Sequence, residues 1–147
     1  MFDLRGRVAV ITGASSGLGV QMAKGLAGQG ADLAILARRK EKLEKVAEEI
    51  RAMGVRCLPI VCDVTNTEQI NAAAEQVIKE FNKVDILINN AGSSANAGVI
   101  NMTDEEWDFT IETDLTSVFK VTRAFAKYMV ERKYGRIINI ASMYGLV

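Results

Sequence analysis

The sequence predicts an α/β fold of three layers, in which a doubly wound parallel sheet of about five strands lies between two layers of helices. Short apolar runs alternate with longer helical patterns along the whole chain, which is typical of repeated β-α-β units. In addition, a glycine-rich turn from Thr12 to Gly19 separates the first apolar run from the first helical pattern. This strand-turn-helix arrangement is common in doubly wound sheets.

Each element follows from its residue pattern. Apolar runs short enough for strands, and rich in Val, Ile, Leu and Ala, occur at 7–12, 32–37, 55–61, 84–89 and 136–141. Between them, apolar residues recur every three or four positions, which predicts helices at 17–29, 39–53, 67–81 and 104–133. Asn66 is a favourable N-cap for the third helix, and Thr103 with Glu106 forms a capping-box pattern before the fourth.

The only proline of the chain predicts the strand order. Pro59 falls inside the third predicted strand, and a residue without an N–H is tolerated chiefly on a strand with one unpaired side. We therefore expect this strand at an edge. The order 3-2-1-4-5 places it there and opens a crevice at the carboxyl ends of strands one and four, where open α/β sheets bind ligands.

The fourth predicted helix carries an apolar stripe that is expected to cover the sheet. The stripe consists of Ile111, Leu115, Phe119, Thr122, Phe125 and Met129.

Composition limits the possible functions. The 147 residues have the length of one domain, which we assign to 1–147, and 18 Lys and Arg balance 18 Asp and Glu. The balanced charge argues against nucleic acid or an anionic membrane as a partner. The chain contains no His, which excludes His-based catalytic triads and most catalytic zinc sites, so we predict no metal.

Cysteine placement and the absence of targeting signals predict a cytoplasmic protein. Cys57 and Cys62 are five positions apart in one predicted strand, so they lie on opposite faces and are expected to be reduced core residues. The start of the sequence lacks a secretory signal pattern, and no apolar run is long enough for a membrane span.

The glycine-rich turn after the first strand has the chemistry of a phosphate-binding turn. Gly13 permits a tight turn, Gly17 allows the backbone to approach a diphosphate, and Gly19 allows close packing of helix and sheet. We predict that a dinucleotide contacts Gly13, Ser15, Ser16, Gly17, Leu18 and Gly19. The alternative is a connector that binds nothing, and the absence of a P-loop Lys disfavours an ATPase.

In its Gly-x-x-x-Gly-x-Gly spacing, the turn resembles that of the short-chain dehydrogenase/reductase family. Three further family features follow in order along the chain: Asp63-Val64, Asn89-Asn90-Ala91-Gly92, and Ser142. The resemblance implies a Rossmann fold, here truncated before the family's last strands, and hydride transfer between a nicotinamide and a carbonyl or secondary alcohol.

The resemblance also implies roles for these residues. Asp63 and Val64 would contact the adenine, and Asn90, Ala91 and Gly92 would lie along the cofactor. Taken alone, Asp63 could instead cap a turn, and Ala91-Gly92 could be an ordinary loop.

The end of the second strand predicts NADP rather than NAD. An acid there would bind the ribose 2′-hydroxyl of NAD, whereas an Arg suits the 2′-phosphate of NADP. The segment carries Arg38 and Arg39, and Asp32 lies about 17 Å away at the start of the strand. We expect Arg38 to be the main phosphate partner and Arg39 the second. The alternative is that both belong to the solvated face of the next helix.

Only part of the family's catalytic set is present. Ser142 matches the Ser that orients the substrate carbonyl, although a plain turn serine is an alternative. No Tyr-x-x-x-Lys, the family's proton donor and its partner, occurs in the 147 residues. Asp114 stands where the family has an Asn that helps to hold a proton-relay water, and an ionised acid cannot make every hydrogen bond of Asn.

Finer resemblances concern substrate and assembly. Asp114 and the string at 140–145 resemble a gluconate 5-dehydrogenase-like branch, which implies a sugar acid as substrate. The family also implies a homo-oligomer through the outer face of the 104–133 helix, and without a neighbour the fifth strand would be an apolar edge. We therefore expect association with a second copy or with a complementary C-terminal half.

Three functions remain open from the sequence. The first is the NADP-binding half of an oxidoreductase that does not turn over alone. The second is a dinucleotide-binding module or redox sensor without catalysis. The third is a structural fragment that binds nothing.

Overall fold

A five-stranded parallel sheet in the order β3-β2-β1-β4-β5 forms the centre of the computed structural model, which describes residues 2–93 and 97–142. The strands are β1 (Val8–Thr12), β2 (Asp32–Ala37), β3 (Cys57–Val61), β4 (Ile86–Asn89) and β5 (Arg136–Asn139). The predicted order is confirmed, and Pro59 lies on the edge strand β3 as expected. Where the predicted strand bounds differ, they do so by one or two residues at an end.

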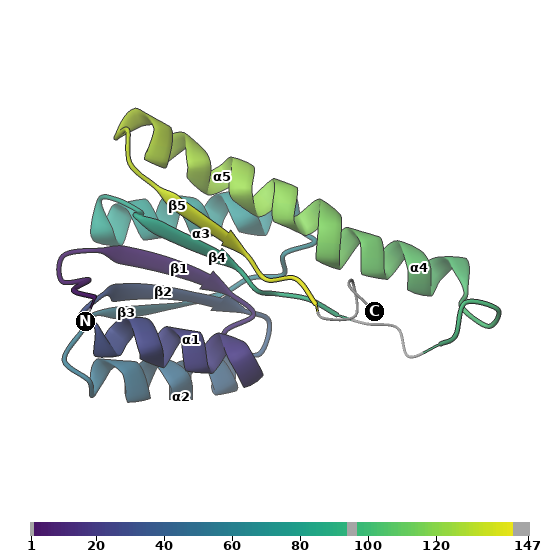
Figure 1. Cartoon of the computed structure of the whole chain (residues 1–147), viewed down its shortest axis with the longest axis horizontal. Coiled ribbons are helices and arrows are strands. Elements are labelled where there is room, and N and C mark those ends of the chain that lie inside the picture. The colour runs from purple at the N-terminus through teal and green to yellow at the C-terminus, as the bar shows by residue number, and fades with distance from the viewer. Residues whose placement is uncertain (1, 94–96, 143–147) are drawn as a thin grey trace.

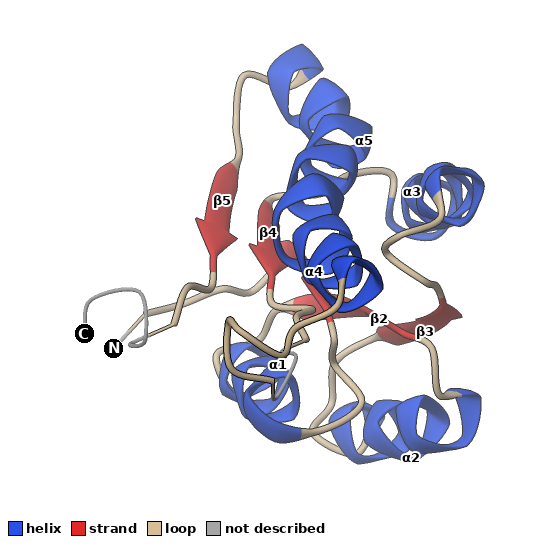
Figure 2. Cartoon of the chain, turned by 90° about the vertical axis from the view of Figure 1, so that its right-hand side faces the viewer, coloured by secondary structure: helices blue, strands red, loops and turns tan. Residues whose placement is uncertain are grey.

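Helices cover both faces of the sheet and make the predicted three layers (Figures 1 and 2). One face packs against α1 (Gly17–Gly28) and α2 (Lys40–Arg51), and the other against α3 (Thr67–Phe81) and α5 (Ser117–Glu131). The predicted N-cap of α3 is present, since Asn66 accepts from the Gln69 amide. No helix of the described residues is long and apolar enough to cross a membrane.

The two cysteines belong to different cores, one on each face of the sheet. Cys57 packs with residues of the α1 and α2 side, and Cys62 with residues of the α3 and α5 side. Both are free thiols, as expected. Burial raises the pKa of Cys57 to about 12 and that of Cys62 to about 11, so neither is a reactive thiolate at neutral pH.

The long helix predicted at 104–133 is interrupted. It consists of α4 (Asp104–Ile111), a π-helical turn η1 (Glu112–Thr116) and α5, and Thr103 with Glu106 forms the predicted capping box at its start. In the π turn the Ser117 amide donates to the Glu112 carbonyl, five residues back. A turn of this kind holds one more residue than an α-turn and therefore changes which side chains face the sheet.

The predicted apolar stripe of this helix is wrong at two of its large residues. Leu115 and Phe119 are 64% and 61% exposed, whereas Phe125 and Met129 are buried as expected. The inner face upstream of Phe125 consists instead of Thr113, Ser117, Val121 and Ala124. The helix is apolar on two sides, and small side chains on one of them allow it to lie close to its neighbours, so periodicity alone does not select the inner side.

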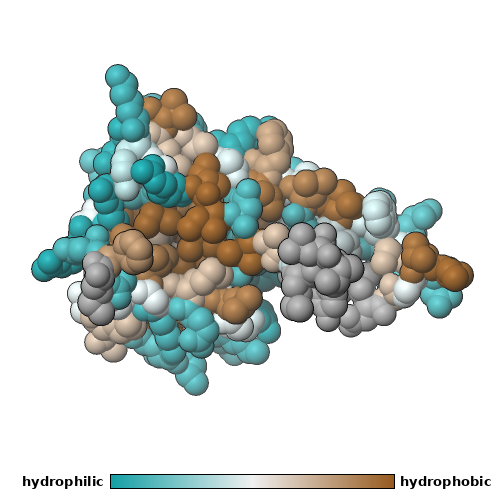
Figure 3. Space-filling view, viewed as in Figure 1, coloured by the Kyte–Doolittle hydropathy of each residue, from teal (hydrophilic) through white to brown (hydrophobic). Residues whose placement is uncertain are grey.

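Strand β5 is an exposed apolar edge, as predicted. Ile137 and Ile138 pair with β4, and the Ile140 amide donates to the Asn89 carbonyl, yet these three side chains are 40% to 46% exposed. Figure 3 shows the apolar surface that gathers over the middle of this side of the molecule. Such an edge favours pairing with further chain.

A buried carboxylate near the amino-terminal ends of the strands binds a backbone amide and three basic side chains. Asp85 is fully buried, accepts from the Val8 amide at 2.9 Å, and is paired at 3.4 to 3.5 Å with Arg7, Lys83 and Arg132. Burial by itself would raise the pKa of Asp85, but the Val8 hydrogen bond and the charges of Lys83 and Arg132 outweigh it and lower the pKa below its ordinary value.

This lowered pKa predicts acid sensitivity. A group whose pKa is lower in the folded state stabilises the fold above its unfolded pKa, about 3.9 for Asp, and this contribution is lost as the pH falls through the folded pKa. Asp85→Asn is expected to lower the unfolding free energy at pH 7 by about 1–3 kcal/mol and to flatten its dependence on pH below 4. Urea unfolding between pH 2.5 and 7 measures both, and the exposed Asp108→Asn is the control. An unchanged acid profile in Asp85→Asn would contradict the assignment.

Candidate functional site

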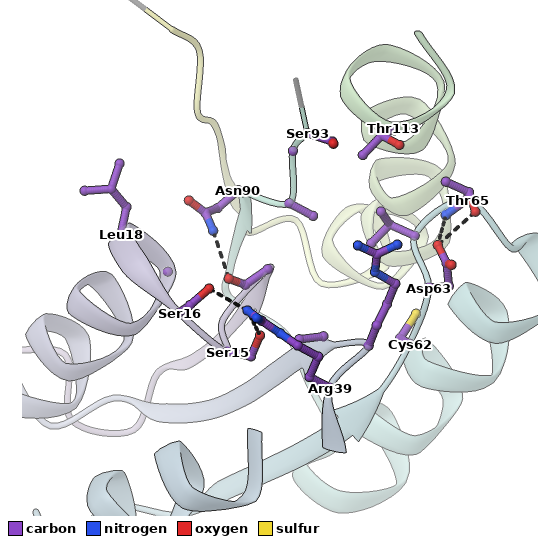
Figure 4. Close-up of a pocket in the computed structure, with 17 residues that line it drawn as sticks. Ser15, Ser16, Leu18, Arg39, Cys62, Asp63, Thr65, Asn90, Ser93 and Thr113 are labelled. Atoms are coloured by element: carbon purple, nitrogen blue, oxygen red, sulfur yellow. Dashed lines mark hydrogen bonds between the residues drawn. The ribbon is translucent and has the colours of Figure 1, made fainter. Parts of the chain in front are cut away.

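A cavity of about 490 Å³ lies at the carboxyl ends of the strands (Figure 4). Its walls come from the turn after β1, the end of β2, the loops after β3 and β4, and Thr113 of η1. All residues predicted for the site line this cavity except Gly17, Asp114 and Ser142. The structure adds residues that the sequence did not single out, namely Ala37, Cys62, Thr65, Ser93 and Thr113. Each of the five adjoins a predicted site residue in the sequence.

The glycines of the turn are required by geometry. Gly13 and Gly17 have φ angles of +67° and +59°, a region that favours glycine. A Cβ on Gly13 would lie 2.8 Å from the Ala91 Cα, and a Cβ on Gly19 would lie 2.5 Å from the Gly13 carbonyl oxygen. The turn is therefore packed against the loop after β4 and has no room for side chains at these points.

Thr12 and Asn90 join the turn to that loop. The Thr12 hydroxyl accepts from the amides of Asn90 and Ala91, each at 3.0 Å. The Asn90 side-chain amide donates in return to the Thr12 carbonyl at 2.9 Å. These bonds hold the loops after β1 and β4 beside each other at the crevice of the sheet, the position predicted from the strand order.

The two arginines after β2 point to different parts of the cavity. The Arg39 guanidinium donates to the Ser16 hydroxyl at 2.7 Å and to the Ser15 hydroxyl at 3.2 Å, across the mouth of the turn (Figure 4). Arg38 lies on the side of Asp63. The Thr65 amide is the main cause of the lowered pKa of Asp63, and the charge of Arg38 lowers it further. Asp63 also accepts from the Thr65 hydroxyl.

Asp32 is placed as the sequence predicted, away from the cavity. Its carboxylate accepts from the Arg56 amide at 2.9 Å and pairs with the Arg56 guanidinium at 2.8 Å. The end of β2 itself therefore carries Arg38 and Arg39 and no acid that could bind a ribose 2′-hydroxyl, and the carboxylate of Asp63, after β3, accepts from Thr65.

The two predicted catalytic residues lie outside the cavity lining. Asp114 is on η1 and its Oδ1 accepts from the Ser93 amide at 2.8 Å. Ser142 is exposed and follows β5 by three residues. The resemblance at 140–145 extends into 143–147, which lie outside the described residues. Within the described ranges, no group of three or more Cys, Asp or Glu side chains is placed to hold a metal ion.

The family model "short chain dehydrogenase" matches residues 7–147, nearly the whole chain. The chain belongs to the short-chain dehydrogenase family. Among curated members, it is 39% identical over 146 residues to nodulation protein G of Rhizobium sp. (strain N33) and 41% identical over 149 residues to the NADP-dependent mannitol dehydrogenase of Alternaria alternata. Each alignment covers 99% of this chain, but only 58% and 56% of the respective relative.

Solved structures of short-chain dehydrogenases share the fold. The NAD+-bound xylitol dehydrogenase superposes with a TM-score of 0.94 at 35% identity, over 97% of this chain and 55% of that one. The L-sorbose reductase of Gluconobacter frateurii, complexed with NADPH and L-sorbose, gives 0.92 at 36% identity, over 97% and 54%. Relatives thus bind either nicotinamide dinucleotide, and the chain spans a little over half of their length.

Proposed function

We propose that residues 1–147 form the NADP-binding domain of an oxidoreductase that transfers a hydride between nicotinamide and a carbonyl or secondary alcohol. The observation that carries the proposal is the cavity at the carboxyl ends of the strands, which combines a glycine-rich turn with two arginines and no acid at the end of β2. A neutral 2′-hydroxyl calls for an acceptor at this position, whereas a 2′-phosphate calls for cations.

The residues of the cavity fit such a cofactor. The turn from Gly13 to Gly19 would hold the diphosphate at the start of α1, and Arg38 with Arg39 would hold the 2′-phosphate. Asp63 and Val64 would contact the adenine, and the loop Asn90–Gly92 would lie along the cofactor. The buried Thr113 hydroxyl in the cavity wall has no hydrogen-bond partner among the described residues, which suits a site completed by a ligand. When bound, the nicotinamide supplies or accepts the hydride.

Within this chain, Ser142 is the proposed group that orients the substrate oxygen, since its hydroxyl can donate to a carbonyl. Proton delivery needs an acid, and the 147 residues contain no Tyr-x-x-x-Lys. We therefore propose that these residues bind the cofactor but do not turn over alone.

We propose a sugar acid, such as gluconate or its 5-keto form, as the substrate of the whole protein. The proposal rests on the resemblance at Asp114 and 140–145, and several relatives act on sugars or polyols according to their names. Other relatives are named ketoacyl reductases, so 3-oxoacyl thioesters are the competing class.

The test of the proposed function is a titration of the 147-residue chain with NADPH and with NADH, followed by nucleotide fluorescence and thermal shift. Tighter binding of NADPH is expected. Binding of neither nucleotide would reject the proposal in favour of a structural fragment.

A chimera separates an enzyme from a binding module or redox sensor. Residues 1–147 are joined to the portion of the Alternaria mannitol dehydrogenase that the alignment does not cover, which brings the chimera to the length of that relative. If the chimera turns over a substrate and the Ser142→Ala chimera does not, the result supports the proposal that the protein is an enzyme. If the chimera binds nucleotide but turns over no sugar acid, polyol or oxoacyl substrate, the result favours a dinucleotide-binding module or redox sensor without catalysis.

We also propose that a second copy covers the outer face of α4 and α5. Four large apolar side chains along α4, η1 and α5 are each between 44% and 64% exposed, namely Trp107, Phe109, Leu115 and Phe119. The wild-type chain is expected to have the mass of a dimer in light scattering. The double variant Leu115→Asp, Phe119→Asp, which places charges in the contact, is expected to have half of that mass. A monomeric wild-type chain would contradict the prediction.

A further inference from the structure

We infer that Asp114 is a positioning residue for the nucleotide cavity, because it holds the loop after β4 through a backbone hydrogen bond. Its Oδ1 accepts from the Ser93 amide at 2.8 Å, and Ser93 lines the cavity together with Gly92. The inference rests on the proposed nucleotide site, and it replaces a proton-relay role for the Asp114 side chain with a role as hydrogen-bond acceptor.

The loop after β4 is held at two points. Its start is fixed to the end of β1, since Thr12 accepts from the amides of Asn90 and Ala91. Its next described contact is that of Ser93 with Asp114, which lies on η1. Gly92 lies between the two, and a Cβ there would stand 3.4 Å from the Asp114 Oδ1, so the carboxylate closely approaches the backbone. Loss of Asp114 would release one end of this cavity wall.

The π turn explains how Asp114 reaches the loop. Turns of this kind occur frequently at functional sites, because the additional residue turns side chains out of the regular helical register. The turn is anchored by the two residues that precede Asp114. Glu112 pairs with Lys120 at 2.6 Å, and Lys120 also donates to the Thr65 carbonyl at 3.4 Å, while Thr113 is buried in the cavity wall.

The contact requires only an acceptor at position 114. The Ser93 amide is a donor, and the side chains of Asp and Asn both offer an Oδ1 that can accept from it. The structure therefore explains why an acid can stand where the family has an Asn. Asp114→Asn should keep the loop in place, whereas Asp114→Ala should not.

Hydrogen exchange of the Ser93 amide, measured by NMR on the whole chain without nucleotide, tests the contact directly. We expect exchange to be about tenfold faster in Asp114→Ala, and within twofold of wild type in Asp114→Asn and in the control Asp108→Ala on α4. In parallel, Asp114→Ala should weaken the binding of NADPH and NADH by the same factor, about tenfold, because the loop lies outside the region that distinguishes them.

The outcomes distinguish this inference from the proposed function. Equal exchange of the Ser93 amide in Asp114→Ala and wild type would overturn the inference, as would an Asp114→Asn variant that behaves like Asp114→Ala. If wild type binds neither nucleotide, the proposed function fails, but the exchange measurement still tests the contact. Circular dichroism verifies that the Asp114→Ala chain is folded, and the Asn variant tests the acceptor role without removing the side chain.

Discussion

Arg38→Asp is expected to weaken NADPH binding about 100-fold and to leave NADH binding within threefold of wild type. The substitution removes a cation from the proposed 2′-phosphate site and places a like charge there. Arg38 lines the cavity beside Asp63, and no other acid is present at the end of β2. The introduced carboxylate can accept from the 2′-hydroxyl of NADH, so the preference between the two nucleotides should reverse.

Fluorescence titration with both nucleotides at fixed ionic strength measures this reversal. Lys42→Asp, on the exposed side of α2, is the matched control because it makes the same change of charge away from the cavity. An equal loss of affinity for NADPH and NADH would mean that Arg38 supports the structure of the cavity and does not select the cofactor. Unchanged affinity for both nucleotides would favour the alternative that Arg38 and Arg39 belong to the solvated face of the next helix.

Gly19→Ala is expected to weaken the binding of both nucleotides at least 100-fold and to lower the unfolding free energy by about 1–3 kcal/mol. The new Cβ would lie 2.5 Å from the Gly13 carbonyl oxygen, 2.7 Å from the Asn90 Nδ2 and 3.0 Å from the Ala14 Cα. Two of these three atoms are backbone, so relief requires the turn itself to move. The turn is the proposed diphosphate site, which NADPH and NADH share.

Gly25→Ala on the same helix is the matched control. A Cβ there meets nothing within 4 Å, and alanine is favoured over glycine in a helix. This variant should bind both nucleotides as wild type does and gain about 0.4–1 kcal/mol of stability. Urea unfolding and nucleotide titration of the two variants measure the contrast. If a folded Gly19→Ala chain binds both nucleotides as wild type does, the turn is not part of the nucleotide site.

Much of the architecture was predictable because it is encoded locally. Apolar runs and helical periodicity located the strands and helices, Asn66 and Thr103 marked two helix starts, and Pro59 identified an edge strand. The turn from Gly13 to Gly19 was predictable for the same reason, since its backbone angles and close contacts allow only glycine at particular positions.

The inner face of the long helix was not predictable from periodicity. Leu115 and Phe119 fit the predicted stripe but lie on the outer face, because the helix has two apolar sides and contains a π turn. Nothing in the local pattern at 112–116 distinguishes a π turn from an α turn, since the difference depends on how neighbouring elements hold the backbone.

The sequence by itself determined the strands, the edge position of β3, the glycine turn and the two arginines after β2, because each depends on the conformational preference or chemistry of residues close together in the chain. The rest of the strand order followed from the doubly wound pattern that repeated β-α-β units favour. Only the tertiary structure decided that Arg39 bridges Ser15 and Ser16 and that Asp114 holds the Ser93 amide. Both contacts join segments more than twenty residues apart, and their distances follow from the packing of whole elements against the sheet rather than from any local pattern.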